Sequence, residues 1–385
     1  MDNNFNINLE ENENHKYNLC NSPICNENSN CSSKSFSSEK INYNEENTKN
    51  TSLIKEVYAD NLIEELKIIS LLLDEYNYIG MDTEFPGTLY TLENIDDDFY
   101  YKNMEKNVNS LKLIQLGITL TNKKGEYPKD IPYHTWQFNF KFDEKNDLYS
   151  KDSLKLLKDS GINFEILKKN GIEHKKFAEN LIVSGLVLNP NVRWISYQGS
   201  FDFAYLLKLL INENLPKIEN EFITSLGIYF PKYYDLRILI KDIDNYFYGG
   251  LNKLIETLSI KRKGIKHQAG SDSIATIEAF HKLRENGSIN KEKIKKLKNI
   301  LYGIGIGRDN ENTIKYLNHN NNININNIYY INTINSNNYY NKNNQINYCV
   351  NNNRWYYPYF NIYTYGMDEK NLLLHQMKIS QKKIA

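Results

Sequence analysis

The uneven distribution of apolar residues restricts folding to the central part of the chain. Residues 1–52 are rich in Asn, Ser and Glu with very few large apolar side chains, and nearly half of residues 309–353 are Asn. Such segments bury too little apolar surface to offset the conformational entropy that ordering removes. We therefore expect disordered or low-complexity flanks over 1–52 and 309–365, at most a short helix over 366–385, and one α/β domain over 53–308.

Charge and composition exclude several classes of protein. The net charge is zero, so a long basic track along a polynucleotide is not expected, although an enzyme that grips a few terminal nucleotides needs only local positive charge. No apolar run approaches the roughly 20 residues that span a bilayer, and the N-terminus lacks an apolar signal-peptide core. All four cysteines lie in the flanks without a common zinc-binding spacing. We expect a soluble intracellular protein with no disulfide framework and no membrane partner.

The central segment alternates between helical and strand patterns. Asn61 precedes an apolar stripe at helical spacing, and Glu64 is placed to reach back to this cap. Residues 135–140 alternate aromatic and polar side chains, which is typical of a strand. Further strands are expected at 78–82, 111–120, 192–196 and 233–236, and helices at 62–73, 177–183, 202–210, from 250 and from 271. An early strand meander followed by helices predicts a mixed sheet with helices on both sides.

Four acidic residues stand where strand ends would meet helix starts, the usual place for a site on such a sheet. Asp82 and Glu84 alternate in a strand and would point to the same face, while Asp202 and Asp272 fall at the starts of later helices. Carboxylates repel one another unless a cation lies between them, and Mg²⁺ binds through a few carboxylates, water and substrate phosphate. The set predicts a metal centre. Alone, Asp82 and Glu84 would also suit an exposed strand end, and Asp202 a helix N-cap.

His267 is the candidate general base, because it lies five residues before Asp272 and histidine titrates near neutral pH. Phosphodiester hydrolysis at two metal ions needs several carboxylates and one group that accepts a proton. A loop histidine bonded only to the backbone is the plainer alternative. Asp235 is expected to be a structural or capping residue. The cluster Lys261–Lys263 suits either a solvated surface or a contact with RNA phosphates.

The order Asp-x-Glu, a distant Asp, then His-x-x-x-x-Asp resembles the DEDD exonucleases with a histidine in their third motif. More narrowly, several stretches resemble the Caf/Pop-type deadenylases associated with the CCR–NOT complex. These stretches are Tyr76–Gly87, Leu113–Thr119, Thr135–Phe140, Asp202–Leu206, Gly249–Leu251 and His267–Ser273. Two short segments depart from the family pattern, which usually has His-Ser-Gly where this chain has Gln198-Gly199-Ser200, and in which Ile265-Lys266 is unusual.

The resemblance implies a ribonuclease-H-like fold and a metal-dependent 3′–5′ exoribonuclease that shortens poly(A) tails of messenger RNA and releases AMP. It implies Asp82, Glu84, Asp202 and Asp272 as ligands of two divalent cations, Mg²⁺ or Mn²⁺, with His267 as the base. It further implies assembly with the scaffold subunit and a second deadenylase subunit of the CCR–NOT complex, in the cytoplasm and nucleus.

Two alternatives stay open at this point. A non-catalytic adaptor of the same complex would show the loss of a metal ligand, and no ligand position is lost here. A DNA exonuclease would share the metal chemistry, and only a comparison of RNA with DNA distinguishes it, because RNA alone offers a 2′-hydroxyl.

Overall fold

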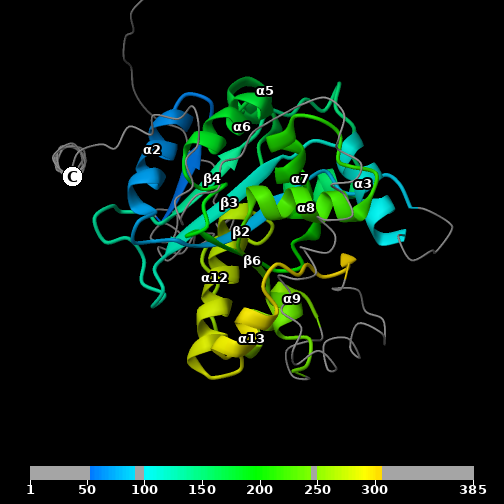
Figure 1. Cartoon of the computed structure of the whole chain (residues 1–385). Helices are drawn as coiled ribbons and strands as arrows, with labels where there is room; N and C mark the ends of the chain where they lie inside the picture. The colour runs from blue at the N-terminus through cyan, green and yellow to red at the C-terminus, as the bar shows by residue number, and fades with distance from the viewer. Residues whose placement is uncertain (1–52, 92–98, 244–248, 306–385) are drawn as a thin grey trace, which may run out of the picture. The chain divides into compact units, whose positions relative to one another are not determined.

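The computed structural model describes residues 53–91, 99–243 and 249–305, which form a mixed sheet covered by helices (Figure 1). The predicted low-complexity flanks, the possible C-terminal helix and all four cysteines lie outside the described residues. In the part of the chain that is described, none of the helices combines the length and apolar character needed to cross a bilayer.

The sheet has six strands in the order β1-β4-β3-β2-β5-β6. Their bounds are β1 Ile54–Val57, β2 Tyr78–Glu84, β3 Gln115–Thr121, β4 Thr135–Asn139, β5 Arg193–Ser196 and β6 Tyr233–Asp235. Strands β2, β3 and β4 form an antiparallel meander, while β1 runs parallel to β4, β5 parallel to β2, and β6 parallel to β5. The predicted mixed sheet with an early meander is therefore confirmed.

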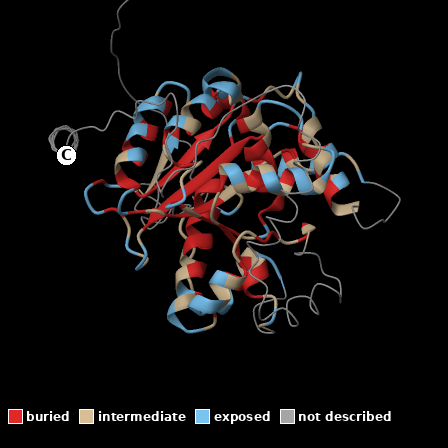
Figure 2. Ribbon diagram, viewed as in Figure 1, coloured by how far each residue is buried: buried red, intermediate tan, exposed pale blue. Residues whose placement is uncertain are grey.

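Helices cover both faces of the sheet, and Figure 2 shows the strands buried between them. On one face, the core contains side chains from α2 Leu62–Leu72, α3 Phe99–Ser110, α6 His174–Val183, α7 Ser200–Ile211 and α8 Glu219–Tyr229. On the other face, the core contains side chains from α9 Leu236–Leu239, α11 Leu251–Thr257, α12 Ala269–Glu285 and residues of α13 Lys291–Lys296. A third, smaller cluster joins α4 Lys151–Asp159 and α5 Phe164–Asn170 to Ile114.

The sequence pattern of β4 explains this arrangement. Trp136 and Phe138 are fully buried in the core on the α2 and α6 side. The intervening Thr135, Gln137 and Asn139 are also buried, which is unusual for polar side chains, and they find hydrogen-bond partners on the opposite face. Burial on both faces is therefore achieved without apolar residues at every position.

The predicted capping of α2 is wrong in its details. The helix begins after Asn61 as expected, but this side chain makes no capping bond to it. Asn61 Oδ1 instead accepts a hydrogen bond of 2.8 Å from the Tyr58 backbone N–H, and Nδ2 donates to the Glu56 carbonyl at 3.0 Å. Both ends of the Asn61 side-chain amide therefore bond to the turn before α2, and none of its atoms caps the helix.

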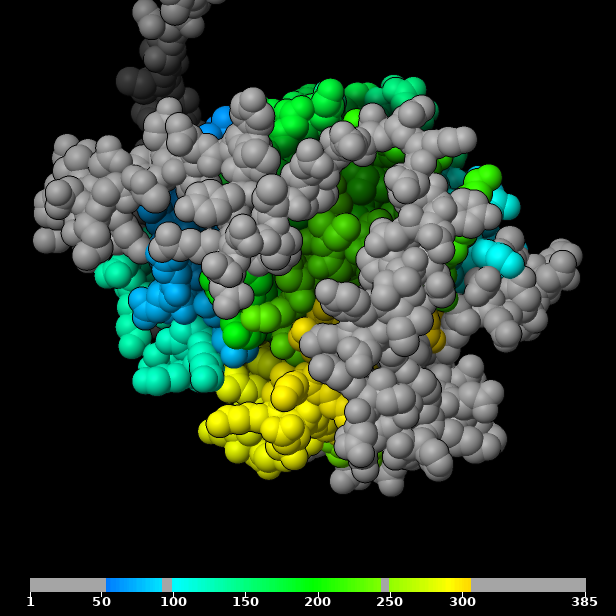
Figure 3. Space-filling model, in the orientation of Figure 1, coloured from blue at the N-terminus to red at the C-terminus, as the bar shows by residue number. Residues whose placement is uncertain are grey.

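Helix α12 crosses the sheet at very short range, because glycines face it on two strands. A Cβ atom added at Gly117 would lie 1.9 Å from the Ala269 carbonyl oxygen, and one at Gly80 would lie 2.5 Å from the Ser273 carbonyl oxygen. Real Cβ atoms do not approach so closely, so these positions need glycine. In the space-filling view, the yellow α12–α13 region adjoins green segments from the middle of the chain (Figure 3).

Candidate active site

Strand β2 presents Asp82 and Glu84 on one face, as predicted. Both residues are partly exposed, whereas the intervening Thr83 is buried. The alternation follows from the two-residue period of a strand. Thr83 is used as well, because its hydroxyl donates a 2.5 Å hydrogen bond to Oδ1 of Asp202.

Asp202 lies in the first turn of α7, which begins two residues earlier than the sequence pattern indicated. The side chain is buried and reaches the end of β2 through the bond to Thr83. The turn before α7, Gln198-Gly199-Ser200, departs from the family pattern but is closely packed. Its Gly199 leaves no room for a side chain, since a Cβ atom there would lie 2.2 Å from Ser196 Oγ.

Asp235 organises that turn from the neighbouring strand. Its fully buried carboxylate accepts backbone hydrogen bonds from Gln198 at 2.8 Å, Gly199 at 3.2 Å and Tyr302 at 3.0 Å. It also caps α9 by accepting from the Arg237 N–H at 2.9 Å. The prediction that Asp235 is a structural and capping residue is confirmed.

Asp272 and His267 come from opposite sides of the start of α12. Asp272 is buried in the first turn, and His267 stands on the preceding loop with a φ of 61°. The Asp272 carboxylate contacts the loop before α12 at two residues, His267 and Arg262. It accepts a 3.0 Å bond from the His267 backbone N–H at Oδ2 and lies 2.8 Å from Arg262 Nη2 at Oδ1.

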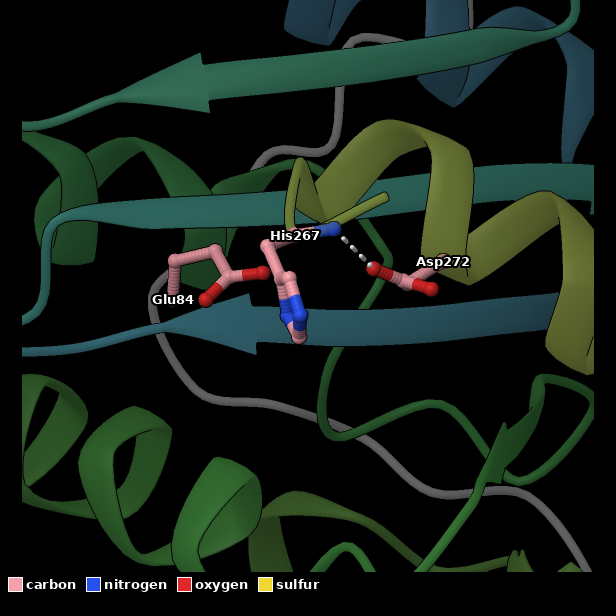
Figure 4. A group of neighbouring side chains, drawn as sticks. All are labelled: Glu84, His267 and Asp272. Atoms are coloured by element: carbon pink, nitrogen blue, oxygen red, sulfur yellow. Dashed lines mark hydrogen bonds between the residues drawn. The ribbon is translucent and has the colours of Figure 1, made fainter. Parts of the chain in front are cut away.

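These elements bring the candidate residues into one cluster. A ligand atom from each of Glu84, His267 and Asp272 lies within 4.8 Å of the other two. Figure 4 shows Glu84 at the end of β2, with His267 between it and Asp272. Asp82 and Asp202 belong to the same cluster, because the charges of Asp272, Asp202 and Glu84 act on Asp82 and the Asp202 charge also acts on Glu84. All five residues singled out in the sequence therefore lie together.

The comparisons with known proteins agree with this arrangement. The family model described as CAF1 family ribonuclease matches residues 57–184. A probable CCR4-associated factor 1 homolog from Arabidopsis thaliana is 44% identical over 260 residues, which cover 66% of this chain and 94% of the relative. The chain belongs to the CAF1 family of ribonucleases.

Two further relatives of this CAF1-family chain are informative. The poly(A) ribonuclease pop2 of Schizosaccharomyces pombe is 41% identical over 258 residues, covering 66% of this chain and 75% of the relative. The solved structure of S. pombe Pop2p in its Mg²⁺- and Mn²⁺-bound form has a TM-score of 0.61 at 40% identity and covers 66% of this chain and all of that one.

A yeast complex adds a partner to the comparison. The structure of the yeast NOT1 MIF4G domain co-crystallised with CAF1 matches with a TM-score of 0.58 at 32% identity, covering 66% of this chain and 98% of that one. The mixed sheet flanked by helices is thus shared with the solved structure of S. pombe Pop2p.

Electrostatics in the CAF1-family site favour a bound cation. Burial and the charges of Asp272, Asp202 and Glu84 raise the pKa of Asp82 well above its ordinary value. Burial, followed by the charges of Asp272 and Asp202, raises the pKa of Glu84 to about 8. Burial likewise raises the pKa of Asp202 to about 7. Closely spaced buried carboxylates offer the hard oxygen ligands that Mg²⁺ and Mn²⁺ prefer, so this donor set fits divalent cations.

His267 is suited to accept a proton. Burial, together with the charge of neighbouring Lys266, lowers its pKa, while the Asp272 carboxylate opposes this shift. A lowered pKa keeps the imidazole neutral at neutral pH, which leaves one ring nitrogen free to act as a base. The side chain is partly exposed at the edge of the cluster, where a substrate can reach it.

Sequence analysis missed two side chains that shape the site. Thr83 gave no signal because it alternates with the acidic residues and its partner is 119 residues away. Arg262 was grouped with a solvated or RNA-binding cluster, but it pairs with Asp272 and donates to Asn252 Oδ1 at 2.5 Å. Its neighbour Lys263 pairs with Glu278 at 2.5 Å. Neither cation belongs to a merely solvated surface.

Two aromatic residues, Phe85 and Phe201, adjoin Glu84 and Asp202 in the sequence. Phe85 stacks on Phe201 with ring centroids 5.5 Å apart and packs on Tyr205 at 4.9 Å. Phe85 and Phe201 are partly exposed, whereas Tyr205 is almost fully buried. Tyr205 thus packs in the core, whereas Phe85 and Phe201 each keep part of their surface exposed.

Proposed function

We propose that this CAF1-family ribonuclease is a metal-dependent 3′–5′ exoribonuclease that shortens poly(A) tails and releases AMP. The observation that carries the proposal is the meeting of Asp82, Glu84, Asp202 and Asp272 with His267 in one cluster. A non-catalytic adaptor has no need to retain such a set of carboxylates, whose mutual repulsion destabilises the fold. We assign the activity to residues 53–308.

Each residue of the cluster has a role that its environment supports. Asp82, Glu84, Asp202 and Asp272 would hold two divalent cations, which supply a water of lowered pKa and stabilise the leaving oxygen. Thr83 fixes the orientation of Asp202 through its hydroxyl. In hydrolysis, a P–O bond forms from water to the scissile phosphate and the bond to the preceding 3′ oxygen breaks. His267 accepts the proton that the attacking water loses.

Poly(A) RNA is the substrate that the relatives indicate. The S. pombe relative is named a poly(A) ribonuclease and is 41% identical to this chain. The exposed Lys266 beside His267 supplies local positive charge for RNA phosphates in a chain with zero net charge. Phe85 and Phe201 are partly exposed and follow or precede an acidic residue of the cluster, which makes them candidates for contact with a base.

The likeness to CAF1 in complex with a NOT1 domain supports assembly into the CCR–NOT complex. This chain would dock on the scaffold subunit, act beside the second deadenylase subunit, and promote mRNA decay and translational repression. We expect the protein to act in the cytoplasm and nucleus. Co-purification of the tagged full-length chain with the scaffold subunit tests the assignment.

The activity is tested with the purified full-length chain on a 5′-labelled RNA that ends in a 3′ tail of adenosines. With Mg²⁺ or Mn²⁺, the product should shorten in single-nucleotide steps as AMP appears, and a chelator or Asp82→Ala should stop the reaction. No cleavage with either cation would favour the adaptor. Equal rates on an oligodeoxyadenosine tail would favour the DNA exonuclease.

A further inference from the structure

A group of buried amide side chains connects the sheet to the start of α12. We call Gln115 on β3, Gln137 and Asn139 on β4, and Gln268 at the N-cap of α12 the amide ladder. Gln115, Gln137 and Asn139 are at most 4% exposed. Buried amides on a sheet face are unfavourable unless each polar atom finds a partner, so their placement here needs an explanation.

The amide ladder caps α12 from outside the helix. The first N–H groups of any helix lack partners within it, and the N-cap residue Gln268 makes no capping bond to its own helix. Gln137 Oε1 accepts from the Gly270 N–H at 2.8 Å instead, and Gln115 Oε1 lies 3.4 Å from the Ala269 nitrogen. Two strands of the sheet thus supply the oxygen atoms that a helix N-terminus normally finds in its own sequence.

Gln137 also fixes the residue that follows His267. Its Nε2 group donates to Gln268 Oε1 at 2.8 Å and to Glu56 Oε1 at 2.9 Å. Gln268 in turn donates from Nε2 to the Ser160 carbonyl at 2.8 Å. Because both ends of the Gln137 amide are used, its side chain has one orientation, and it holds the side chain of the N-cap residue Gln268 and the backbone of Gly270 in the first turn of α12.

Close packing leaves the first turn of α12 no alternative position. Gly117 allows β3 to touch the Ala269 carbonyl, and a Cβ atom at Gly270 would lie 3.0 Å from Gln137 Oε1. Asp272 follows two residues after Gly270, and His267 precedes Gln268 directly. The hydrogen bonds of Gln137 therefore set the rotation and depth of the turn that carries a carboxylate and precedes the base.

We propose that Gln137 is a positioning residue of the active site. It touches no substrate. It acts by holding Gly270 and Gln268, so that the ligand atoms of Asp272 and His267 lie within 4.8 Å of that of Glu84. The inference rests on the proposed metal-dependent ribonuclease function. It extends that function to a strand residue outside the acidic cluster.

The direct test is Gln137→Met in the full-length chain, since methionine keeps the length of the side chain but makes none of its three hydrogen bonds. Partners of metal ligands typically contribute 10–100-fold to metal affinity or activity. We expect Mn²⁺ binding measured by calorimetry to weaken at least about 10-fold. The Mg²⁺ concentration for half-maximal AMP release should rise by a similar factor, with KM for the RNA nearly unchanged.

The matched control is Trp136→Phe, on the same strand but facing the opposite side. This change also removes a buried hydrogen bond, the 2.9 Å contact from Trp136 Nε1 to Glu65. It should lower the unfolding temperature without changing Mn²⁺ affinity. Hydrogen exchange at the Gly270 amide adds a second readout, since it should become faster in Gln137→Met and stay unchanged in the control.

The outcomes separate the inference from the proposed function. Equal Mn²⁺ affinities for Gln137→Met and Trp136→Phe, at similar losses of unfolding temperature, would overturn the positioning role. An inactive parent protein would overturn the ribonuclease proposal, while Mn²⁺ calorimetry would still test Gln137. If Gln137→Met does not fold, Gln268→Met at the partly exposed N-cap removes the bond between the two amides but leaves the bond from the Gly270 N–H, and it should weaken Mn²⁺ binding by a smaller factor.

Discussion

The backbone N–H of His267 donates a 3.0 Å hydrogen bond to Oδ2 of Asp272, the carboxylate five residues later. The candidate base and a candidate metal ligand are therefore held by one contact, and a displacement of either moves the other. His267 has a φ of 61°, a conformation that non-glycine residues adopt rarely and that this bond helps to maintain.

Asp272→Asn separates the two roles of that carboxylate. The amide oxygen can still accept from the His267 N–H, but the amide NH2 group then faces Arg262 Nη2, so this ion pair is lost and the unfolding temperature should decrease. The negative charge is lost, so metal binding and AMP release should fall by more than the roughly 10–100-fold that is typical of partners around metal ligands. Parallel calorimetry and a poly(A) time course measure both effects. Activity near the parent level would exclude Asp272 as a ligand.

Thr83→Val tests the support of Asp202 from the strand. Valine has the shape of threonine but cannot donate to the Asp202 carboxylate, which would leave a buried oxygen without its 2.5 Å partner. We expect about 1–3 kcal/mol of lost stability and roughly 10-fold weaker metal binding, whereas Thr83→Ser should restore both. Denaturant unfolding and Mn²⁺ calorimetry provide the measurements. Failure of Thr83→Ser to recover metal affinity would argue against the hydroxyl contact.

Local patterns in the sequence predicted much of the fold and the residues of the acidic cluster. They did not predict the side chains that hydrogen-bond to the cluster or to the start of α12. Asp82 and Glu84 could be placed on one face because a strand has a two-residue period. Thr83 and Gln137 could not be recognised, since their partners lie 119 and 131 residues away and only the tertiary structure brings them together. Asn61 shows the reverse case, because a correct helix start did not determine which neighbour its side chain would bond.

The stabilisation that Mg²⁺ gives should increase with pH. The pKa of Asp202 is raised to about 7 and that of Glu84 to about 8, so the folded metal-free protein holds more protons than the unfolded chain between about pH 4 and pH 8. The contribution of these two carboxylates to stability therefore falls as pH rises through this window. A bound cation offsets the ionised carboxylates. The increase in unfolding temperature with saturating Mg²⁺ should be small at pH 5.5 and several degrees larger at pH 8.5. An equal increase at both values would contradict the assignment of these ligands.

Two histidines on the α12 side of the sheet should govern stability in mild acid. Burial lowers the pKa of His134 and of His281 to about 4, so both are neutral in the folded protein near neutral pH. Between about pH 6.5 and pH 4 these two groups bind more protons in the unfolded chain, so their contribution to stability should fall as pH decreases, by up to about 1.4 kcal/mol per pH unit for each group.

His281→Gln removes one of these groups while keeping a side chain that can bond to Thr121 Oγ1, which lies 2.9 Å from His281 Nε2. The slope of unfolding free energy against pH is measured by denaturant titration between pH 6.5 and pH 4.5. Relative to the parent it should decrease by up to about 1.4 kcal/mol per pH unit, which corresponds to one proton. Lys282→Gln, at the exposed neighbouring position, serves as the control and should leave the slope unchanged. An unchanged slope in His281→Gln would mean that the pKa of the imidazole is not lowered in the folded state. Protonation would then place a proton on Nδ1, which in the neutral ring accepts a hydrogen bond from Arg284 Nη1 at 3.2 Å while Nε2–H donates to Thr121 Oγ1.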